Sequence, residues 1–261
     1  MKADVNGTTI HYTLEGLGHA PIVMMSHSLL CSGAMWDAQM AALADYRVLR
    51  VDMRGHGASS TPGDDYTLEQ IADDYIALMD HLEIEKVHFI GLSIGGMIGQ
   101  TFALKAPERL LSVTLSSTMS GIPAAAAAMW DERIALAKAE GMEAHVDSTI
   151  GRWFSESFCA EHPELVDPIR ELIRTTSVDG FSGCCRAISR LNLTDKLSAI
   201  KLPTLVIAGE NDPGATPAVA EVIHQNISGS ELVVIDDTLH LCNIEKPDVF
   251  NRAITDFLAK H

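Results

Sequence analysis

The feature that most constrains the fold of this chain is a regular alternation of short apolar runs with longer segments of helical periodicity. The apolar runs expected as strands are Thr8–Leu14, Ile22–Ser26, Arg47–Asp52, Val87–Gly91, Leu110–Ser116, Thr204–Ala208 and Glu231–Ile235. The segments expected as helices are Met35–Ala44, Leu68–Leu82, Ser93–Lys105, Ala218–Gln225 and Pro247–Ala259. This alternation predicts an α/β fold in which helices cover both faces of a mostly parallel sheet.

One stretch breaks the alternation. From about residue 121 to residue 192, helical periodicity continues without an intervening strand. Because the alternation resumes afterwards, we interpret this stretch as a helical cap inserted between two strands. The expected organisation is a core domain of residues 1–120 and 193–261, with a cap formed by residues 121–192. A chain of 261 residues can bury a large core without disulfides or metal ions.

Composition and charge restrict the partners. The formal net charge is −16, and such an acidic surface repels nucleic acids and anionic membranes. No apolar run approaches the roughly 20 residues of a membrane-spanning helix, and the N-terminus lacks an apolar stretch after Lys2, unlike a secretory signal. The five cysteines lack zinc-ligand spacing and suit a reducing compartment. These features predict a soluble, cytoplasmic protein that binds no nucleic acid, membrane or metal ion.

The strongest local motif is Gly91-Leu92-Ser93-Ile94-Gly95-Gly96, which lies between an apolar strand and a helical segment. This succession of strand, sharp turn and helix is typical of a serine nucleophile held on a tight turn. The flanking residues must lack side chains so that strand and helix can approach each other. At the helix start, free N–H groups and the helix dipole favour developing negative charge. We therefore predict that Ser93 is a catalytic nucleophile.

His240 is the predicted general base. In folds with this serine turn, the acid and the histidine of the catalytic triad follow the serine in the chain. His240 lies in the loop Asp236–His240, which follows an apolar run. Such a loop could bring the imidazole to the edge of the sheet. The other histidines after Ser93 fall in the cap, in a helix or at the terminus: His145, His162, His224 and His261.

Asp212 is the predicted acid of the triad. It lies in the loop Gly209–Pro213, directly after an apolar run. Its side chain is shorter than that of Glu210 and is expected to lie deeper in this loop. Its role would be to fix the histidine tautomer and to stabilise the imidazolium. Asp236 and Asp237 stay as weaker alternatives.

An oxyanion hole requires two backbone N–H donors. One is expected from Ile94, the residue after the nucleophile, and the other from Leu29, in a loop after an earlier strand. His27 in this loop precedes Ser93 and is interpreted as a residue that braces the loop by hydrogen bonding. The segment Asp52–Ser59 lacks the Lys-Ser/Thr pair of a phosphate loop. We expect it to form a structural turn.

With these residues identified, nearly the whole chain resembles the 3-oxoadipate enol-lactonase group of α/β-hydrolases. The serine turn and an Arg-Gly-His-Gly turn belong to the superfamily generally, whereas the cap segments are more specific to the group. The segments that carry the resemblance are Ser26-His27-Ser28-Leu29, Met35-Trp36-Asp37, Arg54-Gly55-His56-Gly57, Gly95-Gly96-Met97, Pro107-Glu108-Arg109, Met129-Trp130, Arg152-Trp153-Phe154 and Gly180-Phe181-Ser182-Gly183-Cys184-Cys185. The resemblance implies the α/β-hydrolase fold and hydrolysis of 3-oxoadipate enol-lactone in bacterial degradation of aromatic acids, without metal or cofactor.

The resemblance also directs attention to the substrate side of the site. The group usually has Ser-Asn-Ser-Leu-Gly where this chain has His27 and Leu30, so that Leu30 replaces a residue without a side chain near the substrate. The group's substrate carries a carboxylate, which this acidic chain could bind only beside a local cation.

Arg133 and Arg152 in the cap are the candidate cations. Arg133 follows Trp130 at the helical spacing i, i+3, and Arg152 adjoins Trp153. Each pair could place a guanidinium beside an aromatic wall, so all four residues are predicted substrate contacts. The alternative for both arginines is an ordinary exposed charge on a helix.

The resulting hypothesis is lactone hydrolysis through an acyl-serine, with a small-molecule ester or lactone as partner and a homo-oligomer left open. A carboxylesterase or a lactonase of other scope would use the same catalytic residues. A ligand receptor with weak or absent turnover is a further alternative, which the complete triad disfavours. Ser93 argues against dehalogenases and epoxide hydrolases of this fold, which use an aspartate at that position.

Overall fold

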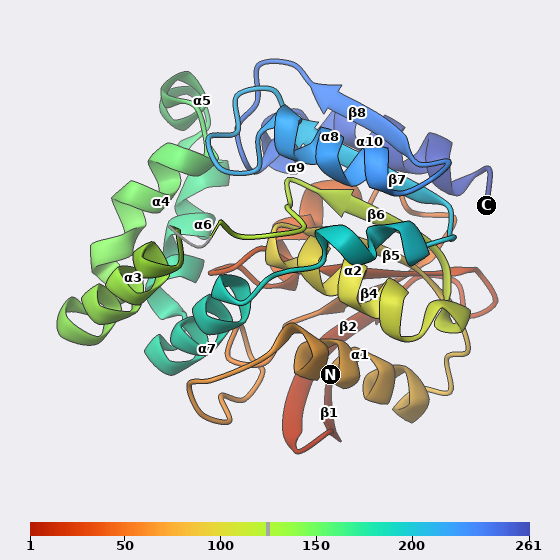
Figure 1. Cartoon of the computed structure of the whole chain (residues 1–261), viewed down its shortest axis with the longest axis horizontal. Coiled ribbons are helices and arrows are strands. Elements are labelled where there is room, and N and C mark those ends of the chain that lie inside the picture. Colours follow the sequence, from red (N-terminus) through yellow and green to blue (C-terminus); the bar gives the residue numbers. More distant parts are fainter. Residues whose placement is uncertain (124–125) are drawn as a thin grey trace.

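A computed structural model describes residues 1–123 and 126–261 (Figure 1). Within these residues the centre is an eight-stranded sheet with the strand order β1-β2-β4-β3-β5-β6-β7-β8. The pairs β1·β2 and β2·β4 are antiparallel, and the remaining neighbours are parallel. The strands are β1 Lys2–Val5, β2 Thr8–Glu15, β3 Ile22–Ser26, β4 Arg47–Val51, β5 Val87–Leu92, β6 Leu110–Ser116, β7 Thr204–Gly209 and β8 Glu231–Ile235.

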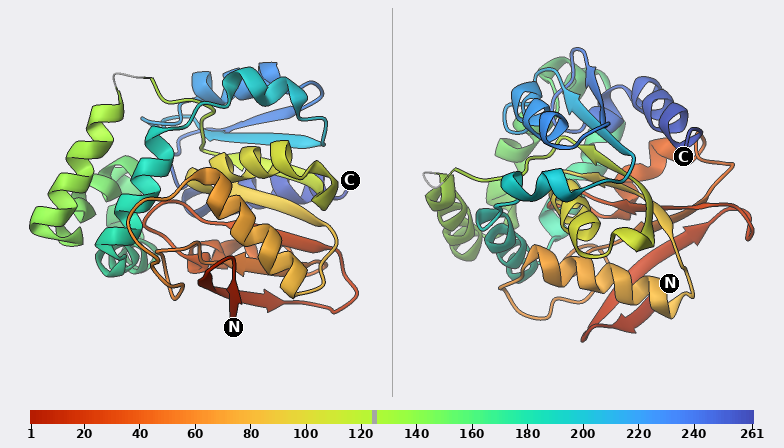
Figure 2. Two further views of the ribbon diagram at one scale, coloured as in Figure 1. Left: turned by 60° about the horizontal axis from the view of Figure 1, so that its bottom comes forward. Right: turned by 45° about the vertical axis from the view of Figure 1, so that its right-hand side comes forward.

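Helices cover both faces of this sheet, which is the predicted α/β architecture (Figure 2). α1, α2 and α8 lie on one face, and α9 and α10 lie on the other. β5 and β7 are buried along their whole length, which explains their continuous apolar sequences. No helix of the described residues is long and apolar enough to cross a membrane. The α-helices are α1 Leu68–His81, α2 Ile94–Lys105, α3 Ala127–Glu140, α4 Val146–Trp153, α5 Glu156–Glu161, α6 Pro163–Thr175, α7 Val178–Ser189, α8 Pro217–Asn226, α9 Cys242–Glu245 and α10 Pro247–Leu258.

The strands expected from the sequence are all present, and their ends agree to within about one residue. β1 is an addition, because a four-residue strand is too short to show a clear alternating pattern. It forms a hairpin with β2 through Asn6 and Gly7, whose φ angles are 47° and 73°. An Asn-Gly pair is the sequence that such a turn favours. This pair was the signal that could have identified the hairpin.

The helix expected at Met35–Ala44 is wrong. The structure instead has a short 3₁₀ helix, η1, at Gly33–Gln39. Trp36 is fully buried there, and Gln39 Nε2 donates to Asn243 O at 2.9 Å. These contacts with the C-terminal part of the chain favour the tighter helix over the α-helix that local periodicity indicates.

Helices α3 to α7 lie between β6 and β7 and project to one side of the sheet (Figure 1). The two ends of this helical segment meet in an isolated antiparallel bridge between Gly121 and Asn192. Beside it, Leu193 N–H donates to Ser120 O at 2.7 Å. The bridge lies at the boundaries expected for the cap, and it supports our proposal that residues 121–192 form a unit distinct from the core.

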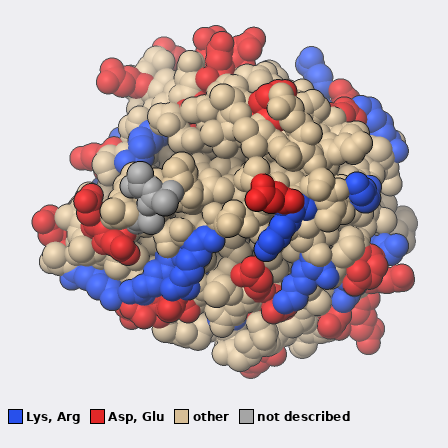
Figure 3. All heavy atoms as spheres, in the orientation of Figure 1, with Lys and Arg blue, Asp and Glu red and all other residues tan. Residues whose placement is uncertain are grey.

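Ion pairs connect the cap to the loop that precedes α1. Lys138 and Arg186 both contact the carboxylate of Asp64, and Arg190 lies 2.8 Å from Asp65. Figure 3 shows Lys and Arg side chains gathered along this edge of the cap, with acidic side chains beside them. Such partly exposed pairs each contribute about 0–1 kcal/mol to stability. Tighter contacts are therefore needed to fix the cap in place.

Two glycines provide one such contact. Gly55 has a φ of +77°, in the region that favours glycine, and its backbone lies against Gly180 of α7. A Cβ atom on Gly180 would overlap the Cα and carbonyl oxygen of Gly55. A Cβ atom on Gly183 would lie 2.5 Å from the ring of Tyr66. The glycines of α7 are thus required by the close approach of this helix to the core.

Gly180→Ala is expected to lower the free energy of unfolding by about 1–3 kcal/mol, because the added methyl group forces two backbones apart. The matched control is Gly151→Ala in α4, where an added Cβ meets nothing within 4 Å. This control should be neutral or stabilising by up to about 1 kcal/mol, because alanine favours a helix more than glycine does. Urea unfolding of both variants checks the prediction, which equal midpoints would contradict.

Candidate active site

The carboxyl ends of three parallel strands carry the predicted triad. Ser93 follows β5, Asp212 follows β7 and His240 follows β8. The carboxyl ends of parallel strands share one edge of a sheet, which is where open α/β sheets bind ligands. A cavity of about 380 Å³ lies at this edge. It is lined by Ser28, Leu29, Ser93, Met97, Ser117, Met119, Ile122, Pro123, Ala126, Met129, Trp130, Arg133, Arg152, Trp153, Ile188, Asp212, Pro213, Gly214, Ala215 and His240.

Ser93 occupies a strained turn at the start of α2. Its φ of 59° and ψ of −118° lie outside the regions that residues with side chains usually adopt. A Cβ atom on Gly91 would overlap the carbonyl group of Gly95, and one on Gly95 would overlap that of Ser26. Thr118 Oγ1 donates to Ser93 O at 2.7 Å and helps to hold the turn. The two glycines of the motif are therefore required by close backbone approach.

Asp212 and His240 are joined by a hydrogen bond of 2.7 Å between Oδ2 and Nδ1. The other carboxylate oxygen accepts N–H groups from Gly214 at 2.8 Å and Ala215 at 3.0 Å. Burial tends to raise the pKa of Asp212, but the interaction with His240 and these hydrogen bonds outweigh it and lower the pKa below its usual value. The carboxylate is therefore ionised at neutral pH and holds Nδ1 of His240, so that Nε2 can act as the proton acceptor.

The other acids considered for the triad contact different groups. Glu210 Oε2 accepts the N–H of Asp237 at 2.9 Å, and the carboxylate of Asp237 lies 3.5 Å from Lys246 Nζ. Asp236 and Asp237 are both exposed. This arrangement favours Asp212 as the acid, and its catalytic role stays a prediction.

The residues expected to form the oxyanion hole lie at adjoining strand ends. β3 and β5 are neighbours, with Ser26 paired to Gly91, so the loop after β3 lies beside the serine turn. Leu29 in that loop lines the cavity. Ile94 is the first residue of α2, and N–H groups of a first helical turn have no acceptor within the helix. Both N–H groups therefore stay candidates for binding an oxyanion.

His27 and Leu30, which depart from the group's usual sequence, both have structural explanations. The buried ring of His27 lies 2.7 Å from Ser28 O through Nδ1 and accepts the N–H of Met53 at 3.0 Å through Nε2. Burial lowers the pKa of His27, which agrees with a neutral ring that braces the loop. Leu30 is fully buried and is not among the residues that line the cavity, although its neighbour Leu29 is. The φ of +67° at Leu30 explains why glycine suits this position.

The Arg-Gly-His-Gly turn has a structural role. Arg54 is buried and donates to both carboxylate oxygens of Asp74 in α1, at 2.6 and 2.5 Å. Its guanidinium also lies 5.4 Å from the centroid of the Tyr66 ring. None of these residues lines the catalytic cavity. The turn thus joins the end of β4 to α1 and to the loop before it.

The cap contributes an aromatic and cationic wall to the cavity. The four predicted substrate contacts all line it: Trp130, Arg133, Arg152 and Trp153. The guanidinium of Arg133 lies 4.9 Å from the Trp130 ring, as the i, i+3 spacing predicts, and 5.4 Å from the Phe181 ring. Burial lowers the pKa of Arg133 to about 10, so it stays protonated at neutral pH. Within residues 1–123 and 126–261, neither arginine forms an ion pair.

Trp153 has a contact that the sequence did not predict. In the described part of the chain it forms no cation–π contact with Arg152, because adjacent residues point to different sides of a helix. Its indole instead stacks on the imidazole of His240, with ring centroids 6.0 Å apart and an angle of 23° between the planes. No sequence pattern indicates this contact, because it depends on how α4 packs over the sheet edge.

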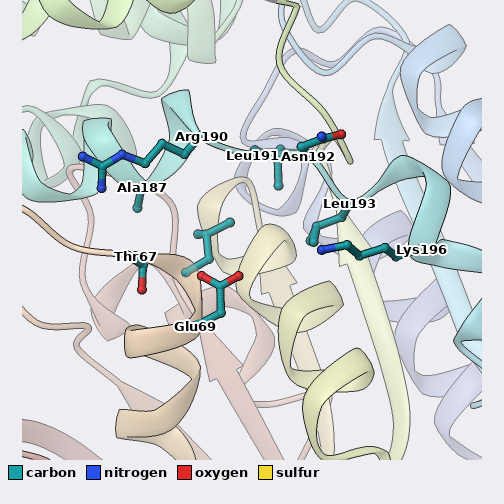
Figure 4. Close-up of a pocket in the computed structure, with 9 residues that line it drawn as sticks. Thr67, Glu69, Ala187, Arg190, Leu191, Asn192, Leu193 and Lys196 are labelled. Carbon is teal, nitrogen blue, oxygen red and sulfur yellow. The ribbon is translucent and has the colours of Figure 1, made fainter.

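A second cavity, of about 290 Å³, lies at the base of the cap (Figure 4). Its lining comes from the start of α1, the end of α7 and the segment after α7: Thr67, Leu68, Glu69, Ala187, Arg190, Leu191, Asn192, Leu193 and Lys196. No histidine or cysteine is among these residues, so this cavity does not hold a serine triad like that of the first cavity. In the described residues, no group of three or more His, Cys, Asp and Glu side chains could hold a metal ion.

Comparison with known proteins identifies the family. The model of the alpha/beta hydrolase fold matches residues 21–247. A strained serine at the end of a central strand, followed in the chain by a hydrogen-bonded aspartate and histidine, is the site that this fold presents. The chain belongs to the α/β-hydrolase fold family.

Named relatives are more specific. 3-Oxoadipate enol-lactonase 2 of Acinetobacter baylyi is 36% identical over 94% of this chain and 91% of its own length. The crystal structure of the enol-lactonase from Burkholderia xenovorans has a TM-score of 0.96 and 38% identity, covering 99% of this chain and all of that one. A putative carbamate hydrolase, RutD, of Variovorax paradoxus is 28% identical over 96% of each chain.

Proposed function

We propose that this enzyme, a hydrolase of carboxylic esters or lactones, opens 3-oxoadipate enol-lactone to 3-oxoadipate. The observation that carries the proposal is one cavity that holds Ser93, the hydrogen-bonded Asp212 and His240, and two arginines that pair with no carboxylate of the described residues. The enol-lactonase relatives support the same substrate. This activity would place the enzyme in the degradation of aromatic acids.

In the proposed mechanism, Ser93 Oγ attacks the lactone carbonyl carbon while His240 Nε2 accepts the serine proton. The oxyanion that forms is bound by the N–H groups of Leu29 and Ile94. Asp212 stabilises the imidazolium. When the tetrahedral intermediate collapses, the ring C–O bond breaks and the enol leaves with the proton from His240. The enol part of the resulting acyl-enzyme then tautomerises to the ketone.

Deacylation uses the same groups in the same order. His240 removes a proton from a water molecule, which attacks the acyl carbon, and the second tetrahedral intermediate releases Ser93 with its proton restored. Trp130, Trp153 and neighbouring apolar side chains line the cavity. A substrate bound against them would displace bulk water, which strengthens the electrostatic interactions of the oxyanion. None of these steps requires a metal ion or a cofactor.

Arg133 and Arg152 would bind the carboxylate of the substrate. The chain carries a net charge of −16, so an anionic lactone needs a local cation to bind. Both guanidinium groups line the cavity, and burial lowers the pKa of both. A partly desolvated hydrogen bond to a charged group contributes about 1.5–3 kcal/mol, which is enough to select an anionic substrate over a neutral one.

The second candidate function is a carboxylesterase or a lactonase of other scope. The RutD relatives favour this second candidate. They are 28–30% identical to this chain but are named as putative carbamate hydrolases, a name that assigns them other substrates. A ligand receptor is disfavoured by the presence in one cavity of Ser93, His240 and the Asp212 that is hydrogen-bonded to it. We also propose a cytoplasmic location, which the five free cysteines support, and leave a homo-oligomer open.

The test of the proposed function compares turnover of 3-oxoadipate enol-lactone with that of short p-nitrophenyl esters. The lactone should be the better substrate by kcat/KM. Ser93→Ala should lower kcat for either substrate by about 10⁶ without loss of the fold, since the nucleophile is removed. Faster turnover of the esters would favour the alternative function. Activity of Ser93→Ala above about a tenth of wild type would exclude an acyl-serine mechanism.

Asp212→Asn should lower kcat by about 10⁴ with the fold intact, because a carboxamide favours the wrong imidazole tautomer. Asp236→Asn and Asp237→Asn are the matched controls, since both carboxylates are exposed and lie on the loop that carries His240. Steady-state kinetics of the three variants tests the assignment. A larger loss in either control would transfer the acid's role to that residue.

Arg133→Ala and Arg152→Ala test the carboxylate contact. If one of these residues binds the substrate carboxylate, its removal should lower kcat/KM for the anionic lactone by about ten- to a hundred-fold, with little change for a neutral ester. Arg170→Ala is the control, because Arg170 is a cap arginine that pairs with Asp147 and does not line the cavity. Equal losses on both substrates would show that the two arginines support only the cap.

A further inference from the structure

The loop that carries His240 is held by backbone hydrogen bonds on both sides of the histidine. On the C-terminal side, Leu241 N–H donates to the carbonyl oxygen of Trp153 at 3.2 Å. On the N-terminal side, Leu239 N–H donates to Glu245 Oε2 at 2.5 Å. The stacking of Trp153 on the imidazole adds a third contact in the same place.

Glu245 connects this loop to the cap. It is the last residue of α9, and its side chain reaches back past His240 to the N–H of Leu239. Its second carboxylate oxygen, Oε1, accepts the N–H of Ser155 at 2.8 Å. Ser155 is the N-cap residue of α5 and lies two positions after Trp153. One carboxylate thus joins a backbone group next to the catalytic histidine with a backbone group of the cap.

The bond from Asp212 does not by itself determine where the imidazole of His240 lies. It fixes one ring atom, Nδ1, and the ring can still move about that atom if its backbone shifts. A general base must stay within hydrogen-bond reach of its proton donor. A displacement of about 1 Å in an active site can lower a rate by a hundredfold. The backbone on either side of His240 therefore has to be held as well.

We propose that Glu245 is a positioning residue, which holds the loop of His240 against the junction between α4 and α5 so that the imidazole stays aligned with Ser93. This inference rests on the proposed function, because it assigns the general base to His240. Glu245 does not line the catalytic cavity, so it acts through His240 and not on the substrate. Arg152, which does line the cavity, immediately precedes Trp153. The same junction thus carries a predicted substrate contact and the groups that hold the base.

A positioning role and a purely structural role predict different kinetics. Loss of alignment lowers the rate of the chemical step for every substrate and leaves binding nearly unchanged. Loss of cap structure would weaken binding of the anionic lactone most, because the predicted carboxylate contacts lie in the cap. Measuring kcat and KM separately, on a charged and on a neutral substrate, therefore distinguishes the two roles.

The first test is Glu245→Gln, which keeps the shape of the side chain. Its NH₂ group would face the N–H of either Leu239 or Ser155, so one of the two hydrogen bonds would be lost. We expect kcat to fall by about ten- to a hundred-fold for both the anionic lactone and a neutral ester, with KM changed by less than about threefold. The matched control is Glu210→Gln. Glu210 also accepts a backbone N–H of the same loop, that of Asp237 at 2.9 Å, but this bond neither adjoins His240 nor reaches the cap.

A second pair of variants removes the contact from the cap side. Ser155 has a φ of −66° and follows a residue in the extended region, so proline fits its backbone. Ser155→Pro removes the N–H that binds Glu245 and should reproduce the fall in kcat. Ser155→Ala removes only the hydroxyl that caps α5 and should keep kcat within about twofold of wild type. This pair keeps the proposal testable if Glu245→Gln does not fold.

A fluorophosphonate probe separates this inference from the proposed function. It phosphonylates an activated serine with release of fluoride and does not need the carboxylate contacts of the cap. In wild type the probe should react with Ser93, and its rate should fall in Glu245→Gln and Ser155→Pro in parallel with kcat. Wild type that neither reacts nor turns over would overturn the proposed function. A reactive wild type whose two variants match Glu210→Gln and Ser155→Ala in kcat would overturn the positioning role alone.

Discussion

The close approach of three backbone segments at the carboxyl edge of the sheet is the constraint on which the rest of the site depends. The end of β3, the serine turn after β5 and the first turn of α2 lie so close that a Cβ atom on Gly91 or Gly95 would overlap a neighbouring carbonyl group. This packing holds Ser93 in a strained conformation and places Leu29 and Ile94 beside it. In the proposed mechanism, these two residues would hold their N–H groups in place before a substrate binds, which is the condition for strong electrostatic stabilisation.

The cap adds the chemical character that the core lacks. Core residues supply the proposed nucleophile, acid and base, whereas the aromatic and cationic wall of the cavity comes from α3 and α4. Burial lowers the pKa of Arg133, which indicates that its charge is partly desolvated and is available to a buried anion. The cap also contacts the loop of His240 through Trp153 and Glu245. In our interpretation, substrate selection and alignment of the base share one structural junction.

Much of the fold and of the candidate site could be predicted from the sequence, because the relevant signals are local. A strand, a Gly-x-Ser-x-Gly turn and a helix must follow one another directly, and the order of Asp212 and His240 after Ser93 follows from the fold. The pairing of Arg133 with Trp130 was also predictable, since helical spacing sets it. The prediction of a helix at Met35–Ala44 was wrong because the decisive contacts are not local. Burial of Trp36 and the hydrogen bonds of Gln39 to distant residues override the local periodicity.

The sequence by itself determined the class of fold, the position of the cap in the chain and the identity of the triad candidates, since each depends on residue types at short spacing. Only the tertiary structure decided which side chains meet across the sheet edge. It stacked Trp153 on His240 and connected Glu245 to Ser155. These contacts join residues far apart in the chain. They depend on how one helix packs against one loop, and no local pattern of amino acids encodes that geometry.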